Sequence, residues 1–197
     1  MSYSCSPSRR VFATGLGAAL AAGLAAPALA QVPQLSDPVI TETVPRNASG
    51  FRTHNWRPYF SSLRNGAILV DTRSRALHFW SEDAKVYKLY PTSIPMTEGM
   101  TRRGRTQVIR MVEGPSWTAT PNMRRRYPHW PAHIPPGPSN PLGTHALYLT
   151  WEYYRIHGTQ DPRKIGRRSS SGCFGLYNES IAELYGLAKL GTQVMVV

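Results

Sequence analysis

The sequence is short of cysteine and of acidic residues, and both shortages limit what the chain can do. It holds 2 cysteines and 11 acidic residues against 23 Lys and Arg, which gives a net charge of +12 at pH 7. A surface of this sign favours polyanions: nucleic acid, an anionic membrane surface or a cell-wall polymer that carries carboxylates. Composition alone does not choose among these three partners.

Long hydrophobic runs are absent after residue 30. The one such run, residues 11–30, follows Arg9 and Arg10, is rich in Ala and Gly, and is broken by Pro27. It predicts a twin-arginine signal peptide over residues 1–30, which directs the protein to the periplasm. A membrane anchor is the alternative, but the run is weakly hydrophobic beside a span rich in Leu and Ile. We therefore expect cleavage and no stable membrane anchor, and the mature chain stays strongly basic.

Signal cleavage would leave Cys173 as the one cysteine of the mature chain, because Cys5 lies before the hydrophobic run. A lone thiol has no disulfide partner within its chain, so it is either an inert buried side chain or a reactive nucleophile. His157 precedes it in the sequence, at the end of a predicted strand. An imidazole that accepts the thiol proton would create a thiolate, and labelling of Cys173 would then persist well below the ordinary thiol pKa.

The remaining sequence predicts an arm and one mainly β domain. Residues 31–62 contain four prolines and scattered aromatics, which predict an extended arm whose distal part packs on the domain of residues 63–197. Segments with β-branched and aromatic residues predict strands, and the first two form a hairpin. These segments are Gly66–Asp71, Arg75–Trp80, Lys85–Tyr90, Thr106–Val112, Thr144–Thr150, Glu152–His157 and Thr192–Val197.

Helical spacing of apolar residues predicts one main helix near the C-terminus, Asn178–Leu190. Ser180 and Glu183 fit a capping box at its start, and Gly191 follows its end. No other segment of the chain has a comparable helical pattern.

Residues 115–141 form a segment with eight prolines. Proline removes a backbone donor and restricts φ, so this segment predicts neither a helix nor a central strand. Long proline-rich loops inside a compact domain often act as lids or binding loops, although a passive surface loop is the alternative. Its candidate contacts are Trp117, Tyr127, Trp130 and the basic run Arg124–Arg126.

The same segment carries His129 and His133, but Pro131 stands between them and no Cys, Asp or Glu is near enough to complete a metal site. We therefore expect no metal at these two histidines.

Catalysis by a cysteine needs a base, a group that orients the base, and donors for an oxyanion. His157 is the candidate base, and the Gly158 carbonyl is the candidate orienting group. The amides of Gly172 and Cys173 are the candidate oxyanion donors, in a tight turn that includes Ser170 and Ser171. The order of His before Cys does not match the papain-like peptidases.

Together these motifs resemble the L,D-transpeptidase catalytic domain of the YkuD type. The resemblance rests on His157-Gly-Thr159, Ser170-x-Gly-Cys173, the helix-opening Asn178, Asn140-Pro-Leu-Gly143 and the Trp-Thr-x-Thr-Pro segment that begins at Trp117, and it spans about residues 66–197. It implies a mixed β-sandwich with one main α-helix near the C-terminus. It also implies that Cys173 is the acylated nucleophile, with His157 as its base and the Gly158 carbonyl as partner of that base.

The resemblance implies a substrate as well. Members of this family cleave an L-to-D bond in a peptidoglycan stem peptide, form a thioester and pass the acyl group to an amine of a second stem, without a cofactor. Basic side chains would then bind the stem carboxylates, whereas export disfavours nucleic acid. The predicted substrate-binding residues are Arg155, Arg163, Lys164, Arg167, Arg168, Phe174, Trp117, Tyr127 and Trp130.

The sequence departs from the family pattern at one position. The family has Arg two residues after the cysteine, where this chain has Gly175. Three readings follow: Arg155 or Arg168 supplies the charge, the enzyme cleaves a different bond, or the domain is inactive and only binds the wall. Because Gly175 and the bulky Phe174 alter the acyl pocket, the sequence favours an atypical link from L-alanine at position 1 to diaminopimelate at position 3.

The alternatives are the conventional 3-3 link, attachment of a protein to peptidoglycan, and side activity as an L,D-carboxypeptidase or endopeptidase. The sequence does not determine the oligomeric state.

Overall fold

The fold is taken from a computed structural model that describes residues 53–197. The predicted signal peptide and the first part of the arm lie outside the described residues. Within the described range, no helix is both long and apolar enough to cross a membrane.

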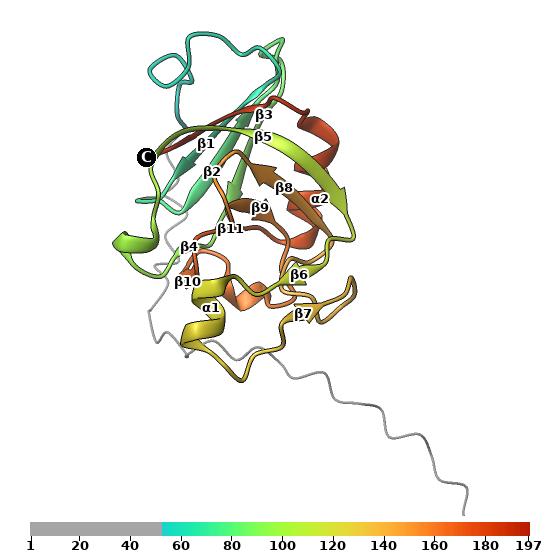
Figure 1. The fold of residues 1–197 in the computed structure, drawn as a ribbon. Coiled ribbons are helices and arrows are strands. Elements are labelled where there is room, and N and C mark those ends of the chain that lie inside the picture. Colours follow the sequence, from blue (N-terminus) through green and yellow to red (C-terminus); the bar gives the residue numbers. More distant parts are fainter. Residues whose placement is uncertain (1–52) are drawn as a thin grey trace, which may run out of the picture. The chain divides into compact units, whose positions relative to one another are not determined.

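The secondary structure is dominated by strands (Figure 1). The strands are β1 (Ala67–Asp71), β2 (Ala76–Trp80), β3 (Tyr87–Pro91), β4 (Ile94–Pro95), β5 (Gly104–Glu113), β6 (Trp117–Thr118), β7 (His133–Ile134), β8 (His145–Leu149), β9 (Arg155–His157), β10 (Arg168–Ser170), β11 (Phe174–Gly175) and β12 (Gln193–Val196). The helices are α1 (Pro121–Arg126), α2 (Asn178–Leu187) and the short 3-10 helices η2 (Glu98–Met100) and η3 (Pro162–Lys164).

Eight strands form one mixed sheet in the order β11-β9-β8-β5-β12-β1-β2-β3. The pairs β1/β12 and β9/β11 are parallel, and the other neighbours are antiparallel. The long strand β5 pairs with β12 through its first half and with β8 through its second, and its register shifts between Val108 and Arg110. Such an irregularity bends a strand, so β5 curls the sheet and joins its two halves.

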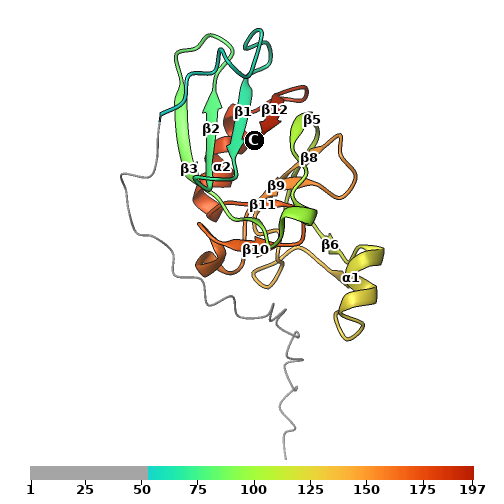
Figure 2. The same cartoon turned by 90° about the vertical axis from the view of Figure 1, so that its left-hand side faces the viewer.

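The main core lies between the two halves of this curled sheet and α2. Phe79 from β2, Leu147 from β8, Ile156 from β9, Phe174 from β11 and Leu184 from α2 are all buried in it. Figure 2 shows β1, β2 and β3 side by side at one end, with α1 and β6 at the other. The mixed β-sandwich with one main helix, predicted from the sequence, is confirmed.

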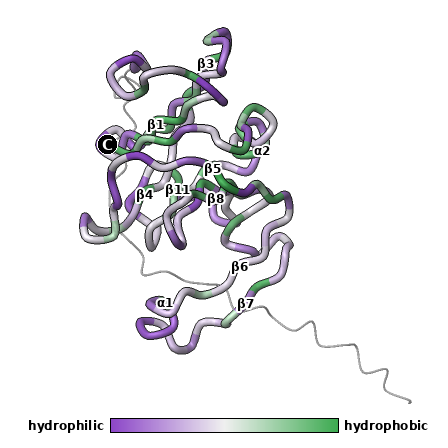
Figure 3. Tube along the Cα trace, turned by 45° about the horizontal axis from the view of Figure 1, so that its top comes forward, coloured by the Kyte–Doolittle hydropathy of each residue, from purple (hydrophilic) through white to green (hydrophobic). Residues whose placement is uncertain are grey.

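A second apolar cluster covers the other face of β1. Phe60 and Leu63 pack there against Leu69 and Trp80. The distal part of the predicted arm therefore packs on the domain, as expected. Figure 3 shows the corresponding hydropathy, with hydrophobic segments along β1 and β8 and a largely hydrophilic α1.

The predicted hairpin is confirmed as β1 and β2, which pair in antiparallel register from Ala67 with Trp80 to Asp71 with Ala76. The strand predicted over residues 152–157 is shorter than expected and begins at Arg155. A tight turn precedes it, because Tyr154 donates its backbone N–H to Trp151 and Tyr153 has φ of 65°.

The prediction that the proline-rich segment contains no helix was wrong, because α1 lies within it. Pro121 stands at the helix start, where its missing N–H does no harm, and Pro128 lies beyond the end. The Thr120 side chain caps the helix by accepting a hydrogen bond from the Met123 backbone (3.2 Å). A single proline-free stretch is enough for a short capped helix.

The predicted capping box on α2 was also wrong. The N-cap residue is Tyr177, which makes no side-chain capping bond. Glu183 instead pairs with Lys88 and accepts a hydrogen bond from the Tyr90 hydroxyl (2.9 Å), which ties α2 to β3. The helix ends at Leu187 rather than at Leu190, because Ala188 adopts an extended conformation.

We expect Asn140→Ala to lower the free energy of unfolding by about 2–4 kcal/mol, because it would leave several buried backbone groups without partners. The buried Asn140 amide donates to the carbonyls of Pro115, Ile134 and Pro135 and accepts from the Leu142 N–H (2.8 Å), so it holds the ends of the proline-rich segment together. Chemical denaturation measures the change, and limited proteolysis should show faster cleavage within residues 115–141.

The exposed Asn55, which makes one local hydrogen bond, provides the matched control as Asn55→Ala. Equal losses of stability in the two variants would contradict the role given to Asn140.

Candidate active site

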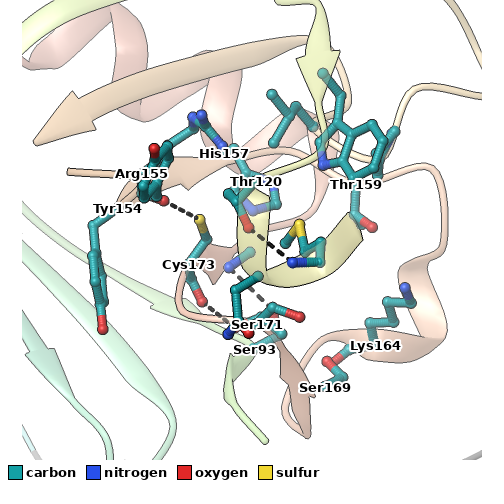
Figure 4. A pocket seen from close by; sticks show the side chains of 18 of the residues that line it. Ser93, Thr120, Tyr154, Arg155, His157, Thr159, Lys164, Ser169, Ser171 and Cys173 are labelled. Atoms are coloured by element: carbon teal, nitrogen blue, oxygen red, sulfur yellow. Dashed lines mark hydrogen bonds between the residues drawn. The ribbon is translucent and has the colours of Figure 1, made fainter. Parts of the chain in front are cut away.

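Cys173 and His157 are brought together by the pairing of β9 with β11. These short parallel strands align Phe174 with Ile156 and Gly175 with His157. Ile156 and Phe174 point into the core, and alternation along a strand places the residues on either side of them on the opposite face. Extending the same register by one residue toward the N-terminus places Cys173 beside Arg155. Figure 4 shows Arg155, His157 and Cys173 close together at one side of a cavity.

The Cys173 thiol donates a hydrogen bond to the Tyr153 carbonyl, with 3.3 Å between Sγ and oxygen. No hydrogen bond joins it to His157 among the described residues. Burial raises the pKa of the Cys173 thiol, and the opposing influence of Arg155, through its charge and hydrogen bonds, does not cancel the increase. The raised pKa favours the thiol form of the resting cysteine.

His157 is held by the Gly158 carbonyl, which accepts a hydrogen bond from Nδ1 at 2.5 Å. A carbonyl can only accept, so Nδ1 carries the proton and Nε2 of the neutral ring is the free acceptor. Burial lowers the pKa of His157 to about 4; the Gly158 carbonyl opposes this change, and the charges of Arg155 and Lys164 add to it. The imidazole is neutral at pH 7, which is the form that accepts a proton.

Asn178 fixes the turn that follows His157. Its side-chain oxygen accepts hydrogen bonds from the backbone N–H groups of Thr159 (3.1 Å) and Thr144 (3.2 Å). The approach requires two glycines, since a Cβ at Gly143 or Gly158 would lie 2.2 or 2.3 Å from that oxygen. The sequence motif contained Asn178, but only as a residue that opens a helix; its role in positioning the histidine turn was missed.

The turn before the nucleophile is held by Ser170. Its hydroxyl donates to the Cys173 carbonyl at 2.5 Å and accepts a long bond of 3.4 Å from the Gly172 N–H. Gly172 has φ of +139°, a conformation that side chains rarely adopt. The long bond leaves the Gly172 amide weakly engaged and able to turn to another acceptor.

A cavity of about 220 Å³ lies over the cysteine and the histidine. The proline-rich segment forms one wall, and the β9 strand with the Ser170–Cys173 turn forms another (Figure 4). The first wall contributes Trp117, Thr120, Asn122, Met123 and Trp130. Tyr127 stands behind it and stacks on Trp130 with 4.1 Å between ring centroids.

The predicted substrate-binding residues divide into two groups. Arg155, Lys164, Trp117 and Trp130 line the cavity, together with the catalytic candidates Cys173 and His157 and the turn residues Ser170 and Ser171. Three predicted residues are not among the lining residues and have other neighbours. The Arg163 guanidinium forms a two-pronged ion pair with Asp161, Arg168 pairs with Glu98 at 2.9 Å, and Phe174 is fully buried in the core.

The other predicted side chains also lie outside the lining set. Arg167 follows η3, and the basic run ends α1, where Arg126 contacts the Met100 sulfur. Within residues 53–197 no group of three or more His, Cys, Asp or Glu is placed to hold a metal ion.

The Ser93 side chain occupies the space beside Gly175. A Cβ at Gly175 would lie 2.5 Å from Ser93 Oγ, and that hydroxyl accepts a hydrogen bond from the Gly175 N–H at 3.0 Å. A backbone bridge between the two residues and a bond from Thr92 Oγ1 to the Gly175 carbonyl complete the contact. A side chain at position 175 would therefore require the Ser93 hydroxyl to move. Sequence reasoning missed Ser93, because the contact spans a long separation in the chain.

We expect Gly175→Ala to lower the free energy of unfolding by about 1–2 kcal/mol, because the new methyl group would displace the Ser93 hydroxyl. In a Ser93→Ala background the same change should cost less, since the nearest remaining contacts of the methyl group lie at 3.7 Å. Denaturant melts of the wild type, both single variants and the double variant measure the coupling. Additive losses would contradict direct contact between the two side chains.

The pH dependence of Cys173 alkylation tests the protonation state. A raised pKa means a smaller thiolate fraction at neutral pH, so the rate of reaction with iodoacetamide should rise with pH and reach half its maximum above about 8.5, the value of a free cysteine. A rate that stays constant from neutral pH down to about pH 5 would instead reveal a resting thiolate paired with imidazolium.

Comparison with known proteins places this site in a family. Residues 65–196 match the family model described as YkuD, the L,D-transpeptidase catalytic domain. The chain is 51% identical over 189 residues to a putative L,D-transpeptidase of Fuscovulum blasticum, covering 96% of both. It is 36% identical over 141 residues to the probable L,D-transpeptidase ErfK/SrfK of Escherichia coli, covering 69% of this chain but 45% of that protein. The chain thus spans less than half of ErfK/SrfK.

Solved structures show the same fold. The L,D-transpeptidase of Xylanimonas cellulosilytica matches with a TM-score of 0.53 and 18% identity, covering 76% of this chain and 66% of that one. The ertapenem-acylated catalytic domain of the E. faecium L,D-transpeptidase matches with a TM-score of 0.52 and 19% identity, covering 68% of this chain and 97% of that one. The chain belongs to the YkuD family of L,D-transpeptidase catalytic domains, whose acyltransferase chemistry typically uses a cysteine nucleophile.

Proposed function

We propose that the chain is a periplasmic peptidoglycan L,D-transpeptidase with Cys173 as nucleophile and His157 as proton acceptor and donor. The observation that carries this proposal is the β9/β11 pairing, which sets a thiol and a neutral, oriented imidazole side by side under one cavity. Family membership supports the reaction class. The periplasmic location rests on the sequence of residues 1–30, read as a twin-arginine signal.

The first half-reaction forms a thioester. The Cys173 thiol leaves the Tyr153 carbonyl, passes its proton to Nε2 of His157, and the thiolate attacks the carbonyl carbon at an L-to-D bond of the donor stem. The amides of Gly172 and Cys173 are the proposed donors to the resulting oxyanion. The C–N bond then breaks, and the departing D-residue takes the proton from His157 to leave as a free amine.

The second half-reaction transfers the acyl group. A diaminopimelate amine of the acceptor stem gives a proton to His157 and attacks the thioester carbon. The C–S bond breaks, and the proton from His157 restores the Cys173 thiol. Water in place of the amine would give hydrolysis, the side activity of a carboxypeptidase or endopeptidase.

The proposed link joins L-alanine at position 1 to diaminopimelate at position 3. Its support is the altered site around Gly175, where the Ser93 hydroxyl fills the position that a side chain would need. Phe174 adds no support, because its side chain lies in the core rather than in the cavity. The conventional 3-3 link and attachment of a protein to peptidoglycan are the alternative outcomes.

The products distinguish these outcomes. Purified protein is incubated with muropeptide tetrapeptides, and the cross-linked dimers are sequenced by tandem mass spectrometry. We expect dimers joined from position 1 to position 3 with the wild type, and no dimers with Cys173→Ala because the nucleophile is lost.

Dimers joined only through position 3 would overturn the proposed link and leave the reaction class intact. If the wild type forms no product, and binds sacculi as well as Cys173→Ala does, the chain is a non-catalytic wall-binding module instead.

A further inference from the structure

Gly175 carries no side chain, so a positive charge beside the nucleophile would come from another residue. The choice of that residue rests on the proposed function, because it concerns how the same site holds its donor substrate. Two cationic side chains line the cavity, Arg155 and Lys164. Figure 4 places Arg155 next to Cys173 and Lys164 on the far side of the cavity.

Strand geometry puts Arg155 on the catalytic face. It stands two residues before His157 on β9, so the two side chains share a face of the sheet. The β9/β11 register sets it beside Cys173, two residues before Gly175 on the neighbouring strand. An arginine at 175 would extend from β11 on this same face, and Arg155 reaches the nucleophile from β9.

The Arg155 side chain hydrogen-bonds to Cys173, and it has no carboxylate partner among the described residues. Its Cζ lies over the Tyr148 ring, 5.1 Å from the centroid, in a cation–π contact. Its Nε is buried and has no hydrogen-bond partner within residues 53–197. The acidic side chain in the cavity lining, Glu152, hydrogen-bonds to Tyr153 instead and raises the pKa of that hydroxyl.

The other arginines near the site differ in this respect. Arg163 is engaged by Asp161, and both Arg168 and Arg103 are engaged by Glu98. A buried donor left without a partner is unfavourable, and an anionic ligand that enters the cavity would relieve it. Arg155 is therefore the cation prepared to receive a carboxylate beside the thiol.

The two L-to-D bonds of a stem share one chemical feature. In the bond between L-alanine and D-isoglutamate, the D-residue continues through its γ-carboxyl group, so its α-carboxylate is free. In the bond between diaminopimelate and a terminal D-alanine, the α-carboxylate of D-alanine is free. In both cases a carboxylate stands on the carbon attached to the departing nitrogen.

We propose that Arg155 binds this α-carboxylate of the departing D-residue, and so supplies from β9 a cation that Gly175 does not supply. A guanidinium can hold both carboxylate oxygens at once, which orients the adjacent C–N bond toward Cys173. The contact selects for a D-residue with a free α-carboxylate at whichever of the two bonds is cleaved.

Three donors test the contact: N-acetylmuramoyl-L-Ala-D-isoglutamate-diaminopimelate-D-Ala, the same peptide with D-isoglutamine, and the same peptide with a terminal D-alaninamide. With the wild type, kcat/KM should fall about 10- to 100-fold for the amide that neutralises the carboxylate beside the cleaved bond, and change little for the other. The amide that reacts more slowly also shows which of the two L-to-D bonds the enzyme cleaves.

Arg155→Gln should lower kcat/KM for the natural donor by the same factor and abolish the discrimination against the amide. Arg155→Lys should retain part of the discrimination, because it keeps the charge without the paired donors. Arg110→Gln is the matched control: Arg110 stacks on the same Tyr148 ring from β5 at 4.9 Å but does not line the cavity, so it should behave like the wild type. Thermal melts and alkylation of Cys173 verify that each variant is folded.

The inference is overturned if the wild type uses the acid and both amides equally, or if Arg155→Gln slows all three donors by one factor. Either result leaves the proposed function standing, because acyl transfer is still observed. Failure of the wild type to consume any donor would instead overturn the proposed function, and the inference would fall with it. If Arg155→Gln does not fold, two other measurements test the inference. These are the ratio of kcat/KM for the acid and amide donors in the wild type, and the reduction of that ratio in Arg155→Lys.

Discussion

The short parallel pairing of β9 with β11 is the constraint on which the rest of the site depends. Ile156 and Phe174 bury one face of the pair in the core, with no exposed side-chain surface. Their burial fixes the register, since a shift of one residue would exchange the two faces of a strand. The opposite face then presents His157 and Cys173 to a common cavity. Hydrophobic contacts in the core thus determine where the His157 and Cys173 side chains lie.

The contacts around this pair favour a neutral resting site. The Gly158 carbonyl orients the histidine, and Asn178 holds the turn that supplies this carbonyl. Burial disfavours charge on both reacting groups, so it raises the pKa of Cys173 and lowers that of His157. Substrate binding would therefore accompany the movement of the thiol away from Tyr153 and the transfer of its proton. Catalytic hydrogen bonds of this kind often form only in the substrate complex.

The fold was predictable where the pattern is long and local. Alternation and β-branched residues marked β1, β2, β5 and β8, and helical spacing marked α2. The two-residue strands β4, β6, β7 and β11 were missed. A segment of two residues is too short to show the alternation of apolar and polar side chains from which a strand is predicted. The helix α1 was missed because the eight prolines of residues 115–141 argued against any helix, although residues 122–127 contain no proline.

The sequence predicted which residues would react, but it did not predict the contacts that hold these residues in place. The motif predicted Cys173 and His157 as the reacting residues and the Gly158 carbonyl as the partner of the histidine, and the structure shows the hydrogen bond between His157 and that carbonyl. The contact of Ser93 with Gly175 and the pairing of Arg168 with Glu98 depend on segments that lie far apart in the chain. No local pattern encodes such contacts, which arise from the fold. The run Arg124–Arg126 on α1 was a candidate for substrate contacts, but it does not line the cavity.

The central claim, acyl transfer through Cys173, is tested most directly by trapping the intermediate. The protein is mixed with a muropeptide tetrapeptide donor, quenched in acid within a turnover, digested and analysed by mass spectrometry. We expect a thioester-linked acyl group on the peptide that contains Cys173, released by hydroxylamine and absent in Cys173→Ala. Formation of cross-linked product by the wild type without such an adduct, or with an adduct on another residue, would contradict the claim.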